Sequence, residues 1–380
     1  MIYLDNNATT MVDPKVYVKQ CEVLRKNFGN ASSVYPIGVE AKQIIKEARQ
    51  KVANLINADI RAGDRVIFTS CATESNNAVF HSVLDQKAKG KHIIISEVEH
   101  PAVIKPAAYY EGAGCRVERI RVDKDGFLDE EQIINSINEN TVLVSIMMVN
   151  SETGVIYNIE HIVKIIRKKN PKILIHTDAV QAAGKIKIDV QCLGVDFLSL
   201  SGHKFHAPKG IGVLYIRRGC LFNPFFLGGH QEEDFRAGTE NVASIAAIGE
   251  AAYLAQQDLE NGVIAKVEAL RNEMEEKLKQ AFPDSIIFGE NNLRVGNTTN
   301  IGFKEVNGSK LVLQLAQKGV CISSGTACNS LTAEPSKVLR AMNVSEDYIR
   351  SIRISLSKEN TDTDIQTLIN EIKYAMIRRK

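Results

Sequence analysis

A lysine and an aspartate each stand at the end of a short apolar run that is typical of a buried strand. Lys204 follows the run DFLSLS within the tetrapeptide SGHK, and Asp178 ends the run KILIHTD. Because α/β sheets bind ligands at the carboxyl ends of their strands, we expect both side chains at a ligand site. A lysine can hold pyridoxal phosphate as a Schiff base, and Asp178 would then keep the ring nitrogen protonated, which makes the ring an electron sink. Taken singly, a solvated loop lysine and a helix-capping aspartate are open alternatives.

A phosphate site is indicated after another strand-like run. Ala72 and Thr73 follow RVIFTS and stand where a helix is expected to begin. The free backbone N–H groups and the dipole of a helix amino terminus attract phosphate, although an ordinary threonine cap is an equal alternative. His100 follows the run HIIIS and would lie against a flat ring, whereas an isolated loop histidine more often has no special role.

Cys328 differs from the other cysteines in its surroundings. It lies in SSGTACNS, a segment of small residues without the apolar pattern that surrounds Cys321. A cysteine on an exposed loop becomes a nucleophile when nearby charge lowers its pKa. We therefore expect Cys328 to react, helped by an active-site cation such as His100, and expect the other thiols to be buried and inert.

The composition excludes several classes of protein. The 380 residues are 44% hydrophobic and 24% charged, as in ordinary globular proteins. A net charge of +2 is not the large positive charge that is typical of a nucleic-acid-binding protein. The longest nearly apolar run, residues 142–149, is far short of the roughly 20 residues that span a bilayer. Seven cysteines without a CxxC pair argue against a disulfide framework and a zinc ribbon. The amino terminus, MIYLDNNATT, lacks the features of a secretory signal, so we expect a cytoplasmic protein.

Strand-like and helical segments alternate from residue 65, which predicts βαβ units and a largely parallel sheet of an α/β protein. The strand-like runs are RVIFT, HIIIS, TVLVSIMM, KILIHTD, DFLSLS and GVLYIR. Asp13 before Pro14 predicts the start of a helix. A long helical stretch over residues 245–280, the short strand SIIFG and a final amphipathic helix predict a second, smaller domain. We expect a ligand site in the cleft between the domains.

The whole chain resembles the pyridoxal-phosphate-dependent cysteine desulfurases of the NifS/IscS type. The motifs that carry the resemblance run in order along the sequence: YLDNNATT, GNASS, ATESNN, EHPAV, HTDAVQ, SGHK, PKGIG, RAGTEN, SSGTAC, EPSKVLRAM and RISLS. The resemblance implies the aspartate-aminotransferase fold, with a mostly parallel seven-stranded sheet in a large domain of residues 14–250. Residues 1–13 and 251–380 would form the smaller α/β domain, and the protein would be a homodimer.

The resemblance also implies an activity and its partners. The protein would remove sulfur from L-cysteine, leaving L-alanine and a persulfide on Cys328. The sulfur would pass to an iron–sulfur scaffold, a tRNA-thiolating enzyme or another acceptor protein, without direct contact with a membrane or nucleic acid. No resident metal is expected, although the family allows Cys328 to act as a transient iron–sulfur ligand.

The family's site residues map onto particular positions of this chain. Lys204 would be the Schiff-base lysine, Asp178 the partner of the pyridine nitrogen, His100 the base stacked on the ring, and Gln181 a contact of the phenolic oxygen. The phosphate would be held by Ala72, Thr73, Ser201 and His203, joined by Thr239 of the partner subunit. Arg353 and Asn150 would bind the substrate, and Arg353 is suited to its carboxylate as a planar, bidentate donor.

One position departs from the family pattern. The family usually reads NNE(T/I)G where this chain has NSETG, so Ser151 replaces the asparagine that reaches the phenolic oxygen. The shorter hydroxyl would reach that oxygen only through water, which changes the strength of the contact.

Two rival functions are open at this point. An aminotransferase or selenocysteine lyase of the same fold would explain Lys204 and Asp178 but not Cys328 as a nucleophile. A non-catalytic sulfur carrier or scaffold would not need the lysine, the aspartate and the phosphate site together. Visible absorbance separates the scaffold from the enzymes, and release of sulfide from L-cysteine separates the enzymes from one another.

Overall fold

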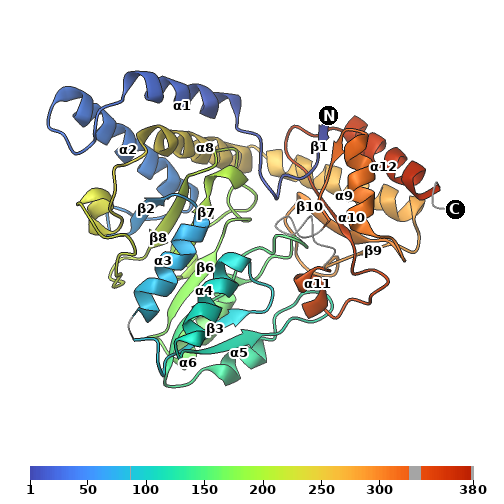
Figure 1. The fold of residues 1–380 in the computed structure, drawn as a ribbon, viewed down its shortest axis with the longest axis horizontal. Coiled ribbons are helices and arrows are strands. Elements are labelled where there is room, and N and C mark those ends of the chain that lie inside the picture. Colours follow the sequence, from blue (N-terminus) through green and yellow to red (C-terminus); the bar gives the residue numbers. More distant parts are fainter. Residues whose placement is uncertain (86, 325–334, 378–380) are drawn as a thin grey trace.

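A seven-stranded sheet forms the centre of the larger part of the computed structural model, which describes residues 1–85, 87–324 and 335–377 (Figure 1). The strand order is β2-β8-β7-β6-β5-β3-β4, and β8 runs antiparallel to both of its neighbours while the other pairs are parallel. The mostly parallel seven-stranded sheet is therefore confirmed. Its strands are β2 (Arg65–Thr69), β3 (His92–Ser96), β4 (Arg116–Ile120), β5 (Thr141–Ser145), β6 (Leu174–Asp178), β7 (Phe197–Ser201) and β8 (Gly212–Ile216).

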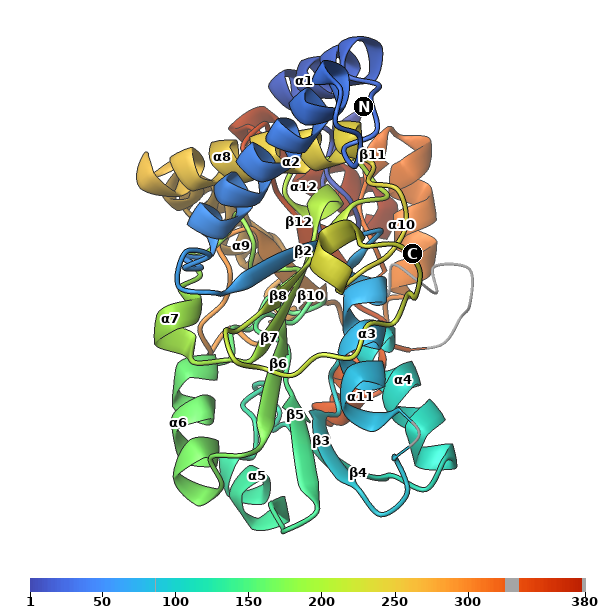
Figure 2. The same ribbon diagram turned by 90° about the vertical axis from the view of Figure 1, so that its left-hand side faces the viewer.

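Helices cover both faces of this sheet (Figure 2). Ile93 and Ile95 of β3 pack in one apolar cluster with α3 (Ala72–Leu84) and α4 (Pro101–Gly112). The intervening Ile94 joins the cluster on the opposite face, with α2 (Pro36–Leu55), α6 (Ile159–Lys169) and α8 (Val242–Glu260). Because neighbouring side chains point to opposite faces and both faces are buried, these strands appear in the sequence as continuous apolar runs. The remaining helices of this part are α1 (Pro14–Lys26), α5 (Glu130–Ser136) and α7 (Val190–Leu193).

A second lobe contains both ends of the described chain (Figure 1). Its three-stranded antiparallel sheet has the order β12-β10-β9, and a separate parallel pair joins β1 to β11. Leu4, Ile301 and Ile354 belong to an apolar core of its own. The elements are β1 (Ile2–Tyr3), α9 (Val263–Ala281), β9 (Ile286–Ile287), β10 (Thr298–Gly302), α10 (Gly308–Gln317), β11 (Val320–Cys321), β12 (Ile352–Ser355) and α12 (Asp362–Ile377). The short helix α11 (Lys337–Ala341) instead packs its buried residues in the large core.

The helical stretch expected over residues 245–280 is two helices. Gly262 interrupts it with a φ of +70°, a left-handed conformation that glycine adopts at low cost. Residues of α8 pack in the large core and residues of α9 pack in the core of the second lobe. The chain therefore crosses between the lobes near Gly262, and the division at residue 250 stays a prediction.

The amino-terminal segment links the two lobes. The Asp13 carboxylate accepts from the backbone N–H of Lys15 at 2.9 Å, so α1 begins where the sequence predicts. Asp5 forms a β-bridge with Ser355 of β12, and Thr10 donates its backbone N–H to His203 after β7 at 2.9 Å. Among the described residues, none of the helices is long and apolar enough to cross a membrane.

Candidate active site

Asp178 lies at the carboxyl end of β6 and is 6% exposed. Its Oδ2 accepts from Nδ2 of Asn76 at 2.8 Å, and its Oδ1 accepts from the backbone N–H of Val180 at 3.0 Å. Asn76 belongs to α3, so the two contacts fix the carboxylate between a helix and the turn after its own strand. The second contact lies in the turn after the strand, and because the next helix begins only at Val190, the expected helix-capping alternative is wrong.

Lys204 follows β7 in a short 3₁₀ turn, as expected from its place after DFLSLS. Its Nζ donates to the backbone carbonyls of Asn7 and Ala8 at 2.7 Å and 2.8 Å. These acceptors come from the amino-terminal segment, almost two hundred residues earlier in the sequence. The amine is therefore held at the junction of the large sheet and the amino terminus.

His100 precedes α4 and acts as its N-cap, because its Nδ1 accepts from the backbone N–H of Ala102 at 3.1 Å. Burial lowers the pKa of His100; the Asp178 carboxylate acts in the opposite direction and Lys204 adds to the lowering. All three groups therefore lie within electrostatic reach of one another. Because Nδ1 accepts a hydrogen bond, a neutral ring carries its proton on Nε2. The imidazolium that we expected beside Cys328 is therefore disfavoured, and we assign His100 a neutral ring.

The amino terminus of α3 carries Ala72 and Thr73, and the residue before it, Cys71, provides no side-chain cap. The alternative that Thr73 caps α3 is therefore wrong. Gly212 of β8 passes so close that a Cβ there would lie 2.5 Å from the carbonyl carbon of Cys71 and 2.9 Å from the nitrogen of Ala72. The backbone N–H groups at this end thus lie in a cradle without bulky side chains, as phosphate binding requires.

Ser201 lies beside this cradle, because its backbone pairs with Gly212, and His203 follows two residues later. Ser201 is buried, and His203 shares a hydrogen bond of 3.1 Å between its Nδ1 and the Thr9 hydroxyl. Burial and the charge of Lys204 lower the pKa of His203 to about 4. Its ring is therefore neutral at physiological pH.

Gln181 and Lys204 converge on one atom. Nε2 of Gln181 donates to the backbone carbonyl of Asn7 at 3.0 Å, and this carbonyl also accepts from Lys204. The Asn7 side chain donates to Oγ1 of Thr298 at 2.8 Å and to the carbonyl of Ser151 at 3.3 Å. Asn7 therefore joins the lysine to both lobes, a role that its place in the motif YLDNNATT does not reveal.

Arg353 in β12 is 2% exposed. Its two terminal nitrogens donate to the backbone carbonyl of Ser151 at 2.9 Å and to Oδ1 of Asp5 at 2.7 Å. Its Nε is buried and has no partner within the described residues. The guanidinium is thus fixed close to Asn7, while its contact with a substrate carboxylate stays a prediction.

Asn150 is also buried, and its amide oxygen is fully used. It accepts from the backbone N–H groups of Glu152 and Thr153 at 2.9 Å and 3.0 Å. Asn150 thus shapes its own turn, and its contact with the substrate stays a prediction. Ser151 reaches the site through its carbonyl, which accepts from Arg353 and Asn7.

Thr239 and Cys328 are the two predicted site residues that the structure does not bring into this cluster or does not describe. Thr239 is exposed on a loop held against α3 by Arg236, whose Nε donates to Oε1 of Glu74 at 2.9 Å. Cys328 lies outside the described residues. On its amino-terminal side, Ser323 exchanges two backbone hydrogen bonds with Arg353, of 3.1 Å and 2.7 Å.

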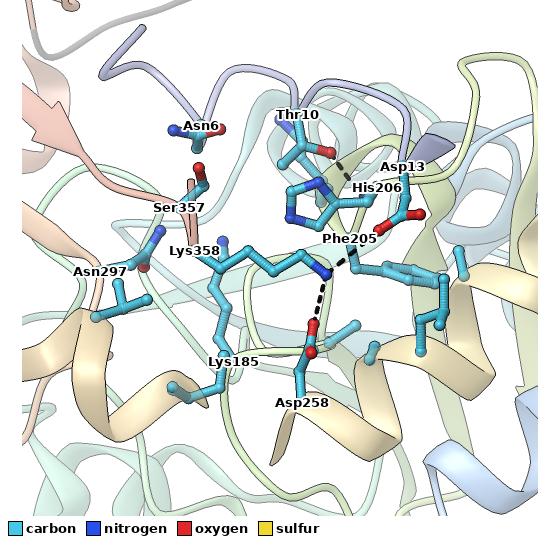
Figure 3. Close-up of a pocket in the computed structure, with 18 of the residues that line it drawn as sticks. Asn6, Thr10, Asp13, Lys185, Phe205, His206, Asp258, Asn297, Ser357 and Lys358 are labelled. Atoms are coloured by element: carbon cyan, nitrogen blue, oxygen red, sulfur yellow. Dashed lines mark hydrogen bonds and ion pairs between the residues drawn. The ribbon is translucent and has the colours of Figure 1, made fainter. Parts of the chain in front are cut away.

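A pocket lies between the lobes next to Lys204 (Figure 3). Lys358 donates to Asp258 of α8 at 2.9 Å and to Asp13 at 3.3 Å, as the dashed lines in Figure 3 mark. These contacts lower the pKa of Asp13, against the effect of its burial. They also raise the pKa of Lys358 despite desolvation. The ion pairs therefore tie the amino-terminal segment to α8 and to the chain after β12.

Glu99, beside His100, is a buried carboxyl that the sequence reasoning did not single out. Its Oε1 accepts from the hydroxyl of Ser96 at 2.6 Å and from the backbone N–H of Met147 at 2.8 Å. Its Oε2 has no partner among the residues that the structure describes. Burial raises the pKa of Glu99 to about 8, and the Asp178 carboxylate adds to the rise.

The raised pKa of Glu99 predicts a pH-dependent stability. In the unfolded chain Glu99 ionises near pH 4.5, whereas the folded protein keeps the proton up to about pH 8. The folded state thus binds more protons within this window, and its stability falls as the pH rises. Glu99→Gln keeps the acceptor and cannot ionise. As the pH rises from 4.5 to 8, the free energy of unfolding of this variant should therefore gain on the order of 4 kcal/mol relative to that of wild type. Urea unfolding at several pH values measures this difference, with the exposed Glu139→Gln as control; parallel pH profiles for wild type and Glu99→Gln would contradict it.

The sequence matches the aminotransferase class-V family over residues 2–368. It is 43% identical over 370 residues to cysteine desulfurase 2 of Trichormus variabilis, covering 97% of this chain and 91% of that protein. The chain belongs to the cysteine desulfurases of this family. It is 40% identical to the cysteine desulfurase NifS of Azotobacter vinelandii, over 98% of this chain and 91% of that one. A solved structure of a NifS-like protein superposes with a TM-score of 0.91 at 35% identity, covering 99% of both chains.

The family depends on pyridoxal phosphate, and the site offers groups that fit this cofactor. The α3 terminus, with the close approach of Gly212, suits a phosphate, and the buried carboxylate of Asp178 suits a protonated ring nitrogen. A neutral His100 ring and the Lys204 amine lie within electrostatic reach of that carboxylate. The chemistry of these groups therefore matches the phosphate, the ring and the aldehyde of the cofactor.

Proposed function

We propose that this protein is a pyridoxal-phosphate-dependent cysteine desulfurase that converts L-cysteine to L-alanine and collects the sulfur on Cys328. The observation that carries the proposal is the convergence of His100, Asp178 and Lys204. They come from the carboxyl ends of β3, β6 and β7 of one sheet. These are the residues whose types match a ring base, an anion for the ring nitrogen and an amine for the aldehyde.

When bound, pyridoxal phosphate supplies an electron sink that stabilises negative charge on the substrate carbon. Lys204 would hold the cofactor through its Nζ and, when released, move a proton at the α-carbon of the substrate. Asp178 would hold the proton on the ring nitrogen, and Asn76 keeps the carboxylate in place for that task. Ala72, Thr73, Ser201 and His203 would bind the phosphate.

Arg353 would bind the substrate carboxylate, using the N–H groups that its contacts with Ser151 and Asp5 leave available. The transfer balances without an added oxidant or reductant. The bond between the β-carbon and sulfur of L-cysteine breaks, a sulfur–sulfur bond forms on Cys328, and the β-carbon takes up the proton that completes L-alanine. The persulfide would then pass its outer sulfur to an acceptor, such as an iron–sulfur scaffold or another sulfur-accepting protein.

We also propose a homodimer in which Thr239 of the partner subunit completes the phosphate site. Large apolar side chains are exposed on α1 and on the loop before Thr239, among them Tyr17, Leu24 and Leu227. Exposed apolar groups of this kind support an interface. Sedimentation analysis of the purified protein tests the dimer.

Asp178→Asn should lower turnover on the order of 100-fold or more, because a neutral amide no longer favours a protonated ring nitrogen. The fold should survive, since asparagine can still accept from Val180. Alanine production from L-cysteine measures the effect, and the exposed Asp284→Asn should retain wild-type turnover. An Asp178→Asn enzyme with nearly normal turnover would remove any role for this carboxylate at the ring nitrogen.

The rival functions give different results with the purified protein. A desulfurase should show the visible absorbance of a lysine-bound cofactor and release sulfide from L-cysteine in the presence of a reducing thiol. A scaffold would show no such absorbance, and an aminotransferase would show it but produce a keto acid without sulfide.

A further inference from the structure

Lys185 is a buried lysine to which neither the sequence motifs nor the proposed chemistry gives a role. It follows the turn after β6, lines the pocket between the lobes, and is 9% exposed (Figure 3). Burial lowers the pKa of Lys185 well below its usual value, and the positive charges of Lys204 and Arg353 add to the lowering. Burying an amine is costly unless its hydrogen bonds are satisfied, so the contacts of Lys185 show what it does.

The Lys185 amine donates to two side-chain amide oxygens. Its Nζ lies 2.5 Å from Oε1 of Gln181 and 3.1 Å from Oδ1 of Asn7. A lysine amine has N–H groups to donate whether it is charged or neutral, and both amides present their oxygen to it and turn their NH₂ groups away. For Gln181 the other side is the active site, where Nε2 donates to the carbonyl of Asn7 at 3.0 Å.

The orientation of the Gln181 amide matters because of its neighbour. The carbonyl of Asn7 accepts from both Nε2 of Gln181 and Nζ of Lys204, at 3.0 Å and 2.7 Å. The two donors are therefore close together. In pyridoxal phosphate the ring oxygen sits on the carbon next to the one that carries the aldehyde, so an amide N–H beside Nζ is placed to donate to that oxygen.

We propose that Lys185 is a positioning residue that fixes the Gln181 amide as a donor toward the ring oxygen of the cofactor. The inference rests on the proposed function, because it takes Lys204 as the residue that holds the cofactor. Without Lys185 the Gln181 amide oxygen loses this donor, and among the described contacts the amide keeps only its hydrogen bond to the Asn7 carbonyl, so it can turn more easily and present its oxygen instead. A donor stabilises the negatively charged form of the ring oxygen and lowers the pKa of the lysine-bound cofactor, whereas an acceptor does the opposite.

The pKa read from the visible absorbance of the loaded protein tests this inference. Lys185→Met, which keeps the length of the side chain and removes the donor, should raise that pKa by about 0.5 to 1 unit. Gln181→Ala should raise it by a similar amount. The double variant should show no further rise, because Lys185 acts through Gln181. The exposed Lys187→Met, two residues along the chain, should titrate as wild type does.

A double-mutant cycle is needed because losing a positive charge near the ring would itself raise the pKa. If Lys185→Met shifts the pKa equally with and without Gln181, the effect is direct and the positioning role is wrong. An unchanged or lowered pKa in Lys185→Met contradicts it as well. Lys185→Arg adds a second check that does not depend on the folding of the methionine variant. Because a guanidinium only donates, the lysine-bound cofactor in this variant should keep its wild-type pKa. A rise as large as in Gln181→Ala would overturn the proposal.

Failure of this inference is distinct from failure of the proposed function. Borohydride reduction of the wild-type protein reports whether the cofactor is attached to Lys204 at all. Normal attachment with unaltered pKa values in the variants overturns only the role of Lys185. Absence of attachment in the wild type overturns the proposed function, and the inference with it.

Discussion

Lys204→Ala should lose covalent attachment of the cofactor and lower alanine production by roughly 10⁴-fold or more. The effect is large because one amine serves two steps: it holds the cofactor and it moves the proton at the α-carbon. We expect the variant to fold, because Lys204 follows β7 rather than forming part of it, and its amine donates to the carbonyls of Asn7 and Ala8. Borohydride reduction followed by peptide mapping measures attachment, and an alanine assay measures turnover.

A neighbouring lysine provides the control for this prediction. Lys209 lies on the same connection before β8 but is exposed, so Lys209→Ala should keep both attachment and turnover. If Lys204→Ala still carries a borohydride-reducible cofactor at the wild-type yield, another residue holds it and the assignment of Lys204 is wrong.

Cys328→Ala should keep the bound cofactor and its colour while alanine and persulfide production fall to the level of a control without enzyme. The sulfur of L-cysteine needs a thiolate to receive it, and the methyl side chain at position 328 of the variant cannot supply one. The variant separates the two halves of the proposal, because cofactor binding depends on Lys204 and sulfur acceptance on Cys328.

Other cysteines provide matched controls for the Cys328 variant. The expectation that these thiols are buried is wrong for Cys21 and Cys192, which are exposed. The hydrogen bond of Cys192 with Asp189 raises the pKa of its thiol. Burial and the nearby Asp196 raise the pKa of Cys220 to about 11. A raised pKa leaves less thiolate at neutral pH, so Cys192→Ala and Cys220→Ala should retain sulfur transfer. Persulfide found mainly on one of these residues, or alanine production surviving in Cys328→Ala, would overturn the mechanism and leave the cofactor assignment intact.

The strands of the large sheet were predictable where both of their faces are buried. Runs such as HIIIS and DFLSLS are continuous and apolar because helices cover both sides of β3 and β7. The strand β4, with the sequence RVERI, was missed. It lies at the edge of the sheet and is only partly buried, so charged residues interrupt its apolar pattern.

The site was predictable in its residue types and less so in its environment. Lys204 and Asp178 could be found because the residue at the end of a buried strand has a defined place in this class of fold. Asn7 could not, since its contacts with Gln181, Lys185 and Lys204 join segments that are far apart in the sequence. Lys185 lies only four residues after Gln181, but its burial belongs to the folded chain. The charge of His100 was also beyond reach, because the burial that lowers its pKa belongs to the folded chain.

One incubation of the loaded wild-type protein with L-cysteine, without a reducing thiol or an acceptor, tests the proposed sulfur transfer most directly. L-Alanine and protein-bound persulfide are measured in the same sample, the latter by mass spectrometry of the peptides. We expect one alanine for each persulfide, with the added sulfur on Cys328. A keto acid in place of alanine, or alanine formed without persulfide on Cys328, would contradict it.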